Sequence, residues 1–223
     1  MSKPAFLVLE DGSVYRGDAF GARRSAHGEV VFNTSMTGYQ EMLTDPSYAG
    51  QIVVPTYPLM GNYGVNERDF ESRRVQVSGF VVREHCVRPS HAMSTSTLDE
   101  FLEAQGVPGL SGLDTRAITR RLRTQGVMMG AITVGEPPES ALARLMEMPA
   151  YGDVDYVARV STLMPYRWTQ GAEPAEQSFR IVVDDFGLKY NILRLLRARG
   201  CEVVAVPAGA TSAEILAREP DGV

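Results

Sequence analysis

The chain has 223 residues, enough for one large domain or for a medium domain and part of another. It is 44% hydrophobic and 22% charged, and no apolar run approaches the roughly 18 residues that cross a bilayer, which indicates a soluble globular protein without membrane spans. The net charge of −5 argues against nucleic-acid binding, because such domains are usually basic. The first apolar segment runs into Glu10 and Asp11, unlike a signal peptide, so we expect a cytoplasmic location.

Strands dominate the first part of the chain. The Asp11-Gly12 pair is a strong hairpin signal between two short apolar runs. Further β-branched and aromatic runs predict buried strands, with a loop rich in Gly, Pro and Asn over 57–66. The expected strands are 5–9, 13–16, 30–32, 51–54 and 75–82.

Helices follow the strands. Helical spacing of apolar residues predicts one over 97–105. Asp114 is a suitable N-cap for a second over 115–124, which Gly126 ends, and a third is expected over 139–146. Strands followed by helices favour a mixed α and β domain over 1–150.

The remainder changes character. Poor periodicity predicts a linker over 151–178. A buried strand over 181–183, a helix over 188–199 with Ile192, Leu195 and Leu196 inward, and a strand over 201–206 form a predicted βαβ unit. Thr211 and Glu214 form a capping-box signature for another helix, and 221–223 leads into a third parallel strand. We expect 179–223 to be the truncated start of an α/β parallel-sheet domain.

The segment from Gly28 to Tyr48 is the most distinctive part of the chain. Its 21 residues carry three charged side chains and many hydroxyls, amides and glycines. Such side chains bond to nearby backbone, so we expect a structured loop over 33–38 and a turn over 45–48. Both loops could serve only to satisfy their own backbone.

The order of these residues resembles a known family. The segment GEVVFNTSMTGYQEMLTDPSYAGQIVVPTYPLMGNYG is similar to the amino-terminal domain of the small, glutamine-hydrolysing subunit of carbamoyl-phosphate synthetase. The resemblance extends to FLVLEDGSVYRGDAFGA, GLDTRAITRRLRTQG, MMGAI and DDFGLKYNILRLLRARGCEVVAVP. It covers nearly the whole chain except 154–178.

The resemblance implies a subunit that releases ammonia from L-glutamine. A large subunit would receive the ammonia and make carbamoyl phosphate from bicarbonate and ATP, for arginine and pyrimidine synthesis. The two subunits would form a heterodimer or a higher oligomer. ATP and Mg²⁺ would belong to the large subunit, and we expect no cofactor in this chain.

The resemblance also implies a fold and one substrate contact. The fold is an amino-terminal β/β/α (swivelling-type) domain followed by the first βαβα of a class I glutamine amidotransferase domain. The family's catalytic cysteine, histidine and glutamate lie beyond Val223, so we expect no catalytic residue here and no glutaminase activity from this chain alone. Ser47, in DPSY, matches a serine that reaches toward the bound glutamine, a task that suits an uncharged hydroxyl. Ser47 could instead simply close its turn.

Neither cysteine fits a nucleophile. Cys201 heads a buried strand with no glycines to expose its sulfur. Cys86 follows His85, but consecutive side chains of a strand point to opposite faces. His85, Cys86 and His91 lack the spacing of a metal site, so we expect no metal.

Three arginines share one face of the helix over 115–124. Arg116, Arg120 and Arg123 lie opposite the apolar positions of this helix. A solvated face is the ordinary interpretation. A contact with the large subunit is the sharper one, because arginine pairs well with carboxylates at interfaces.

Two other functions remain open. The segment after 179 also looks like the first half of a signalling receiver domain, in which Asp184 and Asp185 would hold Mg²⁺. The segment FNTSMTGYQEMLTDPSY disfavours that interpretation, since receivers do not carry it. The other alternative is a non-catalytic module that binds the large subunit.

Overall fold

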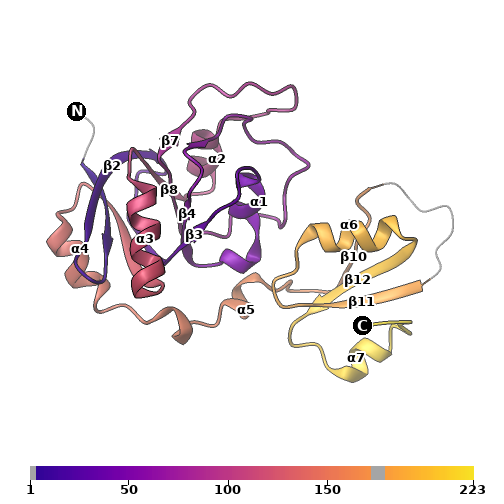
Figure 1. The fold of residues 1–223 in the computed structure, drawn as a ribbon. Coiled ribbons are helices and arrows are strands. Elements are labelled where there is room, and N and C mark those ends of the chain that lie inside the picture. The colour runs from indigo at the N-terminus through magenta and orange to yellow at the C-terminus, as the bar shows by residue number, and fades with distance from the viewer. Residues whose placement is uncertain (1–3, 172–178) are drawn as a thin grey trace. The chain divides into compact units, whose positions relative to one another are not determined.

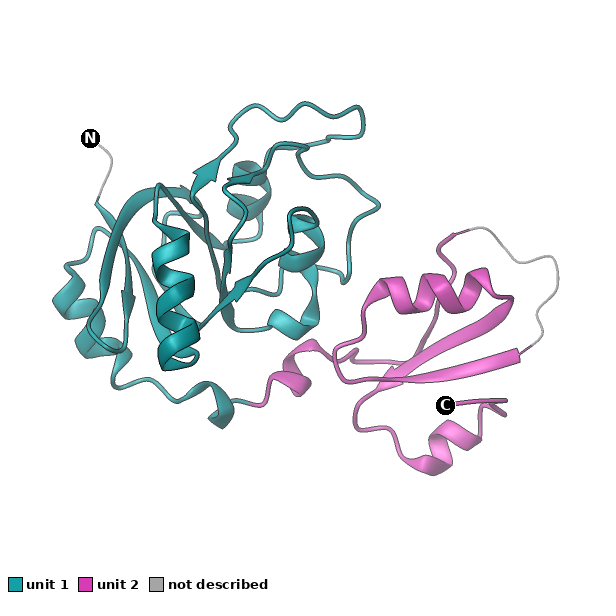
Figure 2. Cartoon of the chain, in the orientation of Figure 1, with its two compact units in different colours: residues 1–154 teal, residues 155–223 magenta. Residues whose placement is uncertain are grey.

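The structure, a computed structural model, describes residues 4–171 and 179–223. The chain divides into two compact units, Met1–Val154 and Asp155–Val223 (Figure 2). The first unit is rich in sheet, and the chain as a whole is a mixed α and β protein, as expected. None of the described helices has the length and apolar character needed to span a membrane.

Seven described strands of the first unit close into a barrel, in the order β1-β2-β8-β6-β4-β3-β9. The neighbours from β3 through β4 and β6 to β8 are parallel, and antiparallel pairs of β1, β2 and β9 complete the ring. The strands are β1 (Ala5–Leu9), β2 (Val14–Gly21), β3 (Ala26–Asn33), β4 (Gln51–Pro55), β6 (Gly79–Val81), β8 (Pro108–Ser111) and β9 (Met128–Val134). A separate parallel pair joins β5 (Leu59–Met60) to β7 (Glu84–His85).

Both faces of the central strands are buried. In β4, Ile52 and Val54 pack in one core cluster with Ile118 of α3, whereas Val53 packs in another with Leu43 of α1. A strand covered on both sides needs apolar residues at successive positions, which explains the continuous run in β4. The helices of this unit are α1 (Tyr39–Thr44), α2 (Leu98–Ala104), α3 (Thr115–Gln125) and α4 (Pro138–Leu145), with the 3-10 turns η1 (Pro46–Tyr48) and η2 (Tyr151–Asp153) (Figure 1).

Local signals located the helix starts well. Thr97 and Glu100 form a reciprocal capping box at α2. The Asp114 side chain accepts a hydrogen bond from the backbone N–H of Ala117 at 3.0 Å and caps α3. Gly126, with φ of 93°, follows the last residue of α3. The predicted N-cap at Asp114 and the predicted helix end at Gly126 are confirmed, whereas the capping box at Thr97 was not predicted.

Other elements were missed or misplaced. The expected strand over 75–82 is correct only for Gly79–Val81, although Val75 and Val77 are buried in the core. Sequence reasoning missed β8 and β9, and it missed α1, which is short and lies in the polar segment. Pairing with distant strands stabilises β8 and β9, and that pairing leaves little local signal.

The second unit contains a small three-stranded sheet in the order β10-β12-β11. Strand β12 is parallel to β11 and antiparallel to β10, and Gly222 forms a parallel bridge to Ile181 of β11. Its elements are α5 (Tyr156–Val160), β10 (Tyr166–Arg167), β11 (Phe179–Asp185), α6 (Tyr190–Ala198), β12 (Cys201–Pro207) and α7 (Ser212–Leu216). The range 151–178, expected as a linker, thus holds η2, α5 and β10 in its described part.

The orientation of α6 differs from the expectation. Ile192 and Leu195 are 46% and 48% exposed, so they do not face the core as predicted. Leu193 and Arg197 are buried instead, and Arg197 Nη1 donates a hydrogen bond to the Trp168 carbonyl at 3.3 Å. Trp168 directly follows β10, so a strand that sequence reasoning placed in a linker helps to set the rotation of this helix.

Candidate functional site

Ser47 lies in the 3-10 turn η1, directly after α1. The turn is closed by Asp45, which is buried and whose Oδ1 accepts a hydrogen bond from the backbone N–H of Ser47 at 2.9 Å. The Ser47 side chain is exposed, and its hydroxyl has no hydrogen-bond partner among the described residues. Since Asp45 and the backbone close the turn, the Ser47 hydroxyl is available to a ligand.

Contacts from distant parts of the chain hold this turn in place. Asn33, at the end of β3, donates from Nδ2 to the Tyr48 hydroxyl at 2.8 Å. The Tyr151 hydroxyl donates to the backbone carbonyl of Ala49 at 2.9 Å. A turn held by these contacts at Tyr48 and Ala49 presents its exposed hydroxyl with little loss of conformational freedom when a ligand binds. Sequence reasoning did not connect Tyr151 to this site.

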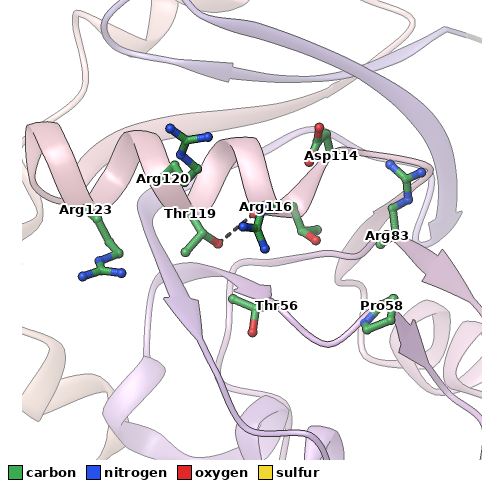
Figure 3. Close-up of a pocket in the computed structure, with 9 residues that line it drawn as sticks. Thr56, Pro58, Arg83, Asp114, Arg116, Thr119, Arg120 and Arg123 are labelled. Atoms are coloured by element: carbon green, nitrogen blue, oxygen red, sulfur yellow. Dashed lines mark hydrogen bonds between the residues drawn. The ribbon is translucent and has the colours of Figure 1, made fainter.

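The three predicted arginines of α3 line one pocket of about 680 Å³ (Figure 3). Figure 3 shows the guanidinium groups of Arg116 and Arg123 on the side of α3 that faces Thr56, whereas Arg120 extends along the opposite edge. The full lining comprises Thr56, Pro58, Arg83, Asp114, Thr115, Arg116, Thr119, Arg120 and Arg123. The three arginines that the sequence grouped together therefore all border one basic concavity, although Arg120 points along its other edge.

Arg83 belongs to this pocket and was missed by the sequence analysis. It lies in the connection between β6 and β7, more than 30 positions before α3. No spacing rule links two such distant segments. Val81 of β6 belongs to the same core cluster as Ile118 and Leu122 of α3, so the strand and the helix pack on one core.

Arg121 on α3 behaves differently from its neighbours. Its Nη1 atom lies 2.5 Å from Asp11 Oδ2, in the turn between β1 and β2. Burial by itself would raise the pKa of the Asp11 carboxyl, but hydrogen bonds from Ser13 and Arg121 outweigh it and lower the pKa. Arg121 thus forms an ion pair with Asp11 inside the first unit.

The cysteines and histidines do not form a catalytic pair. The His85 ring stacks on Phe20 with centroids 4.4 Å apart, and burial lowers the His85 pKa. The Cys86 thiol instead donates to the Arg88 carbonyl at 3.4 Å, and Cys201 is buried in the core of the second unit. Among the described residues no group of three or more His, Cys, Asp and Glu side chains is arranged to hold a metal ion.

Asp185 has a structural task. Its Oδ1 accepts hydrogen bonds from the backbone N–H groups of Gly187 at 3.0 Å and Leu188 at 2.8 Å, and its Oδ2 accepts one from Thr162 at 2.7 Å. This buried carboxylate ties the loop before β10 to the turn after β11. A receiver domain would need both carboxylates for Mg²⁺, so the arrangement disfavours that alternative.

Comparisons with known proteins agree with the motifs. Residues 7–132 match the family model described as the carbamoyl-phosphate synthase small chain, CPSase domain. Proteins named carbamoyl phosphate synthase small chain are 47% identical in Syntrophotalea carbinolica, over 98% of this chain and 61% of the relative, and 50% identical in Bacillus caldolyticus, over 97% and 58%. The Methanopyrus kandleri protein of the same name is 48% identical over 98% of this chain and 60% of its own length. The chain thus spans about three fifths of these relatives, and it belongs to the carbamoyl-phosphate synthase small chain family.

Proposed function

We propose that the protein acts as the small subunit of a glutamine-dependent carbamoyl-phosphate synthetase. In that role it takes part in releasing ammonia from L-glutamine and delivering it to a large subunit that makes carbamoyl phosphate for arginine and pyrimidine synthesis. The observation that carries the proposal is the match of the family model to residues 7–132, which include both Ser47 and the arginines of α3. ATP and Mg²⁺ are assigned to the large subunit, and the reaction to the cytoplasm.

We assign the two units to two parts of the family's architecture. The first corresponds to the amino-terminal β/β/α (swivelling-type) domain over 1–150, and the segment from 179 corresponds to the start of a class I glutamine amidotransferase domain. The parallel pair β11 and β12, with α6 between them in sequence, supports the second assignment. Residues 172–178 of the expected linker lie outside the described residues.

Ser47 is assigned to the L-glutamine contact. Its exposed hydroxyl can donate to or accept from the polar end of the substrate without adding charge. Asp45 and Asn33 support it as positioning residues, because their side chains hold the turn rather than point to a ligand.

We assign the face of Arg116, Arg120 and Arg123 to the large subunit. Exposed arginines around a concavity suit contact with carboxylates of a partner. The same residues favour the narrower alternative, in which the chain is a non-catalytic module whose task is to bind the large subunit.

The experiment is to purify the chain, test it for glutaminase activity, and titrate it with the large subunit. We expect binding without glutamate production, because neither Cys86 nor Cys201 is hydrogen-bonded to a histidine within the described residues. Glutamate production by the chain alone, abolished by Cys86→Ser, would refute the assignment of these cysteines. Failure to bind the large subunit would refute the proposed function.

A further inference from the structure

The pocket beside α3 is lined by arginines whose guanidinium groups have no partner among the described residues. Arg83, Arg116, Arg120 and Arg123 line it, and within the described residues none of their guanidinium groups has a hydrogen bond or an ion pair. All four side chains are exposed. Arg121, on the same helix, pairs with Asp11 instead. Four arginines without such a partner therefore line one concavity.

The surroundings make this concentration unusual. The chain as a whole carries a net charge of −5, so the pocket is a local positive region on an acidic protein. Four cations around one concavity repel one another, the single carboxylate of Asp114 does not balance them, and further carboxylates from a partner relieve the repulsion. The charge distribution therefore favours an anionic occupant.

The chemistry of the pocket argues against a small polyanion at the helix start. Anion sites at helix N-termini use free backbone N–H groups. Here the Asp114 carboxylate lines the pocket and already accepts a hydrogen bond from the Ala117 N–H at 3.0 Å. A phosphate at this end would meet a negative charge rather than a free donor.

The spacing of the arginines along α3 fits a peptide segment. Arg116 and Arg123 are seven positions apart, which is about 10 Å along an α-helix. An extended chain covers that distance in about three residues, so two of its side chains can each meet an arginine. Thr119 Oγ1 donates to the Thr115 carbonyl at 2.7 Å and keeps its lone pairs for a backbone N–H of such a segment.

We propose that this pocket binds an acidic segment of the large subunit, with two or more carboxylates paired to Arg116 and Arg123 and with Arg83 holding the segment at the other side. The inference rests on the proposed function, since it names the chemistry by which the partner is recognised. Bidentate pairing of guanidinium with carboxylate supplies the geometric specificity. Because all the arginines are exposed in the free chain, binding is expected to weaken steeply as salt rises.

The test compares the affinity of the large subunit for matched neutral variants. The double variant Arg83→Gln/Arg116→Gln removes two pocket cations, and Arg121→Gln removes one arginine from the same helix but outside the pocket. We expect the double variant to raise Kd by about 10–100-fold at low salt, and the control by no more than about 2-fold. The slope of log Kd against log salt, from about 50 to about 500 mM NaCl, should fall for the double variant alone.

Further arms separate the remaining outcomes. Unchanged thermal unfolding of the double variant shows that lost affinity is not lost folding. If the wild-type chain binds and the double variant binds equally well at every salt concentration, this inference is wrong while the proposed function stands. If inorganic phosphate stabilises the wild-type chain but not the double variant, and large-subunit binding is unaffected by the substitutions, the pocket is a small-anion site and the inference is overturned. If the wild-type chain does not bind the large subunit at all, both this inference and the proposed function are refuted.

Discussion

The close approach of β3 to the Ser47 turn gives a sharp prediction. Gly28 lies in β3, and an added Cβ would stand 2.1 Å from the Gly50 carbonyl oxygen, at the end of that turn. A carbon and a carbonyl oxygen normally approach to about 3.3 Å, so Gly28→Ala forces the backbone apart by about 1 Å. The obstacle is backbone rather than a flexible side chain, and it cannot rotate away.

The expected cost of Gly28→Ala is about 2–3 kcal/mol, the upper part of the usual range for overpacking. For a unit of the size of Met1–Val154 this lowers Tm by about 4–12 °C. The assay is thermal unfolding followed by circular dichroism, together with hydrogen exchange at the Ser47 amide, which should accelerate as the turn shifts. Gly152→Ala is the control, because its Cβ would meet nothing within 4 Å. A Gly28→Ala melting curve within about 1 °C of wild type would refute the reasoning.

Three further predictions concern substrate, pH and core. Ser47→Ala in the assembled enzyme should raise KM for glutamine while ammonia-dependent synthesis stays unchanged; equal loss of both activities would contradict the contact. Burial lowers the pKa of His85, so as pH drops below about 6.5 the His85 ring takes up a proton in the unfolded chain before it does in the folded one, and stability falls. The urea midpoint of His85→Phe should therefore change less than that of the wild type between about pH 7 and 5. Parallel curves for the two proteins would contradict this. Ile118→Ala should cost about 2–5 kcal/mol because Ile118 is fully buried, whereas the exposed Thr124→Ala should cost far less in the same titration.

Sequence alone determined the features that depend on near neighbours. Caps at Asp114 and Thr211 follow from side chains that bond to backbone three positions away. The shared face of the α3 arginines follows from helical periodicity, and the family resemblance follows from the residue order between Gly28 and Tyr48. Each of these features depends on residues that lie close together in the sequence.

Tertiary structure decided what depends on partners far along the chain. It placed Arg83 beside α3, brought the Tyr151 hydroxyl to the Ala49 carbonyl, and rotated α6 so that Leu193 rather than Ile192 is buried. The local sequence pattern did not predict strands β8 and β9, because their stability comes from pairing with β2 and β3. The physical reason is that barrel closure and core packing are settled between segments many residues apart, where the spacing of residues in sequence carries no information about distance.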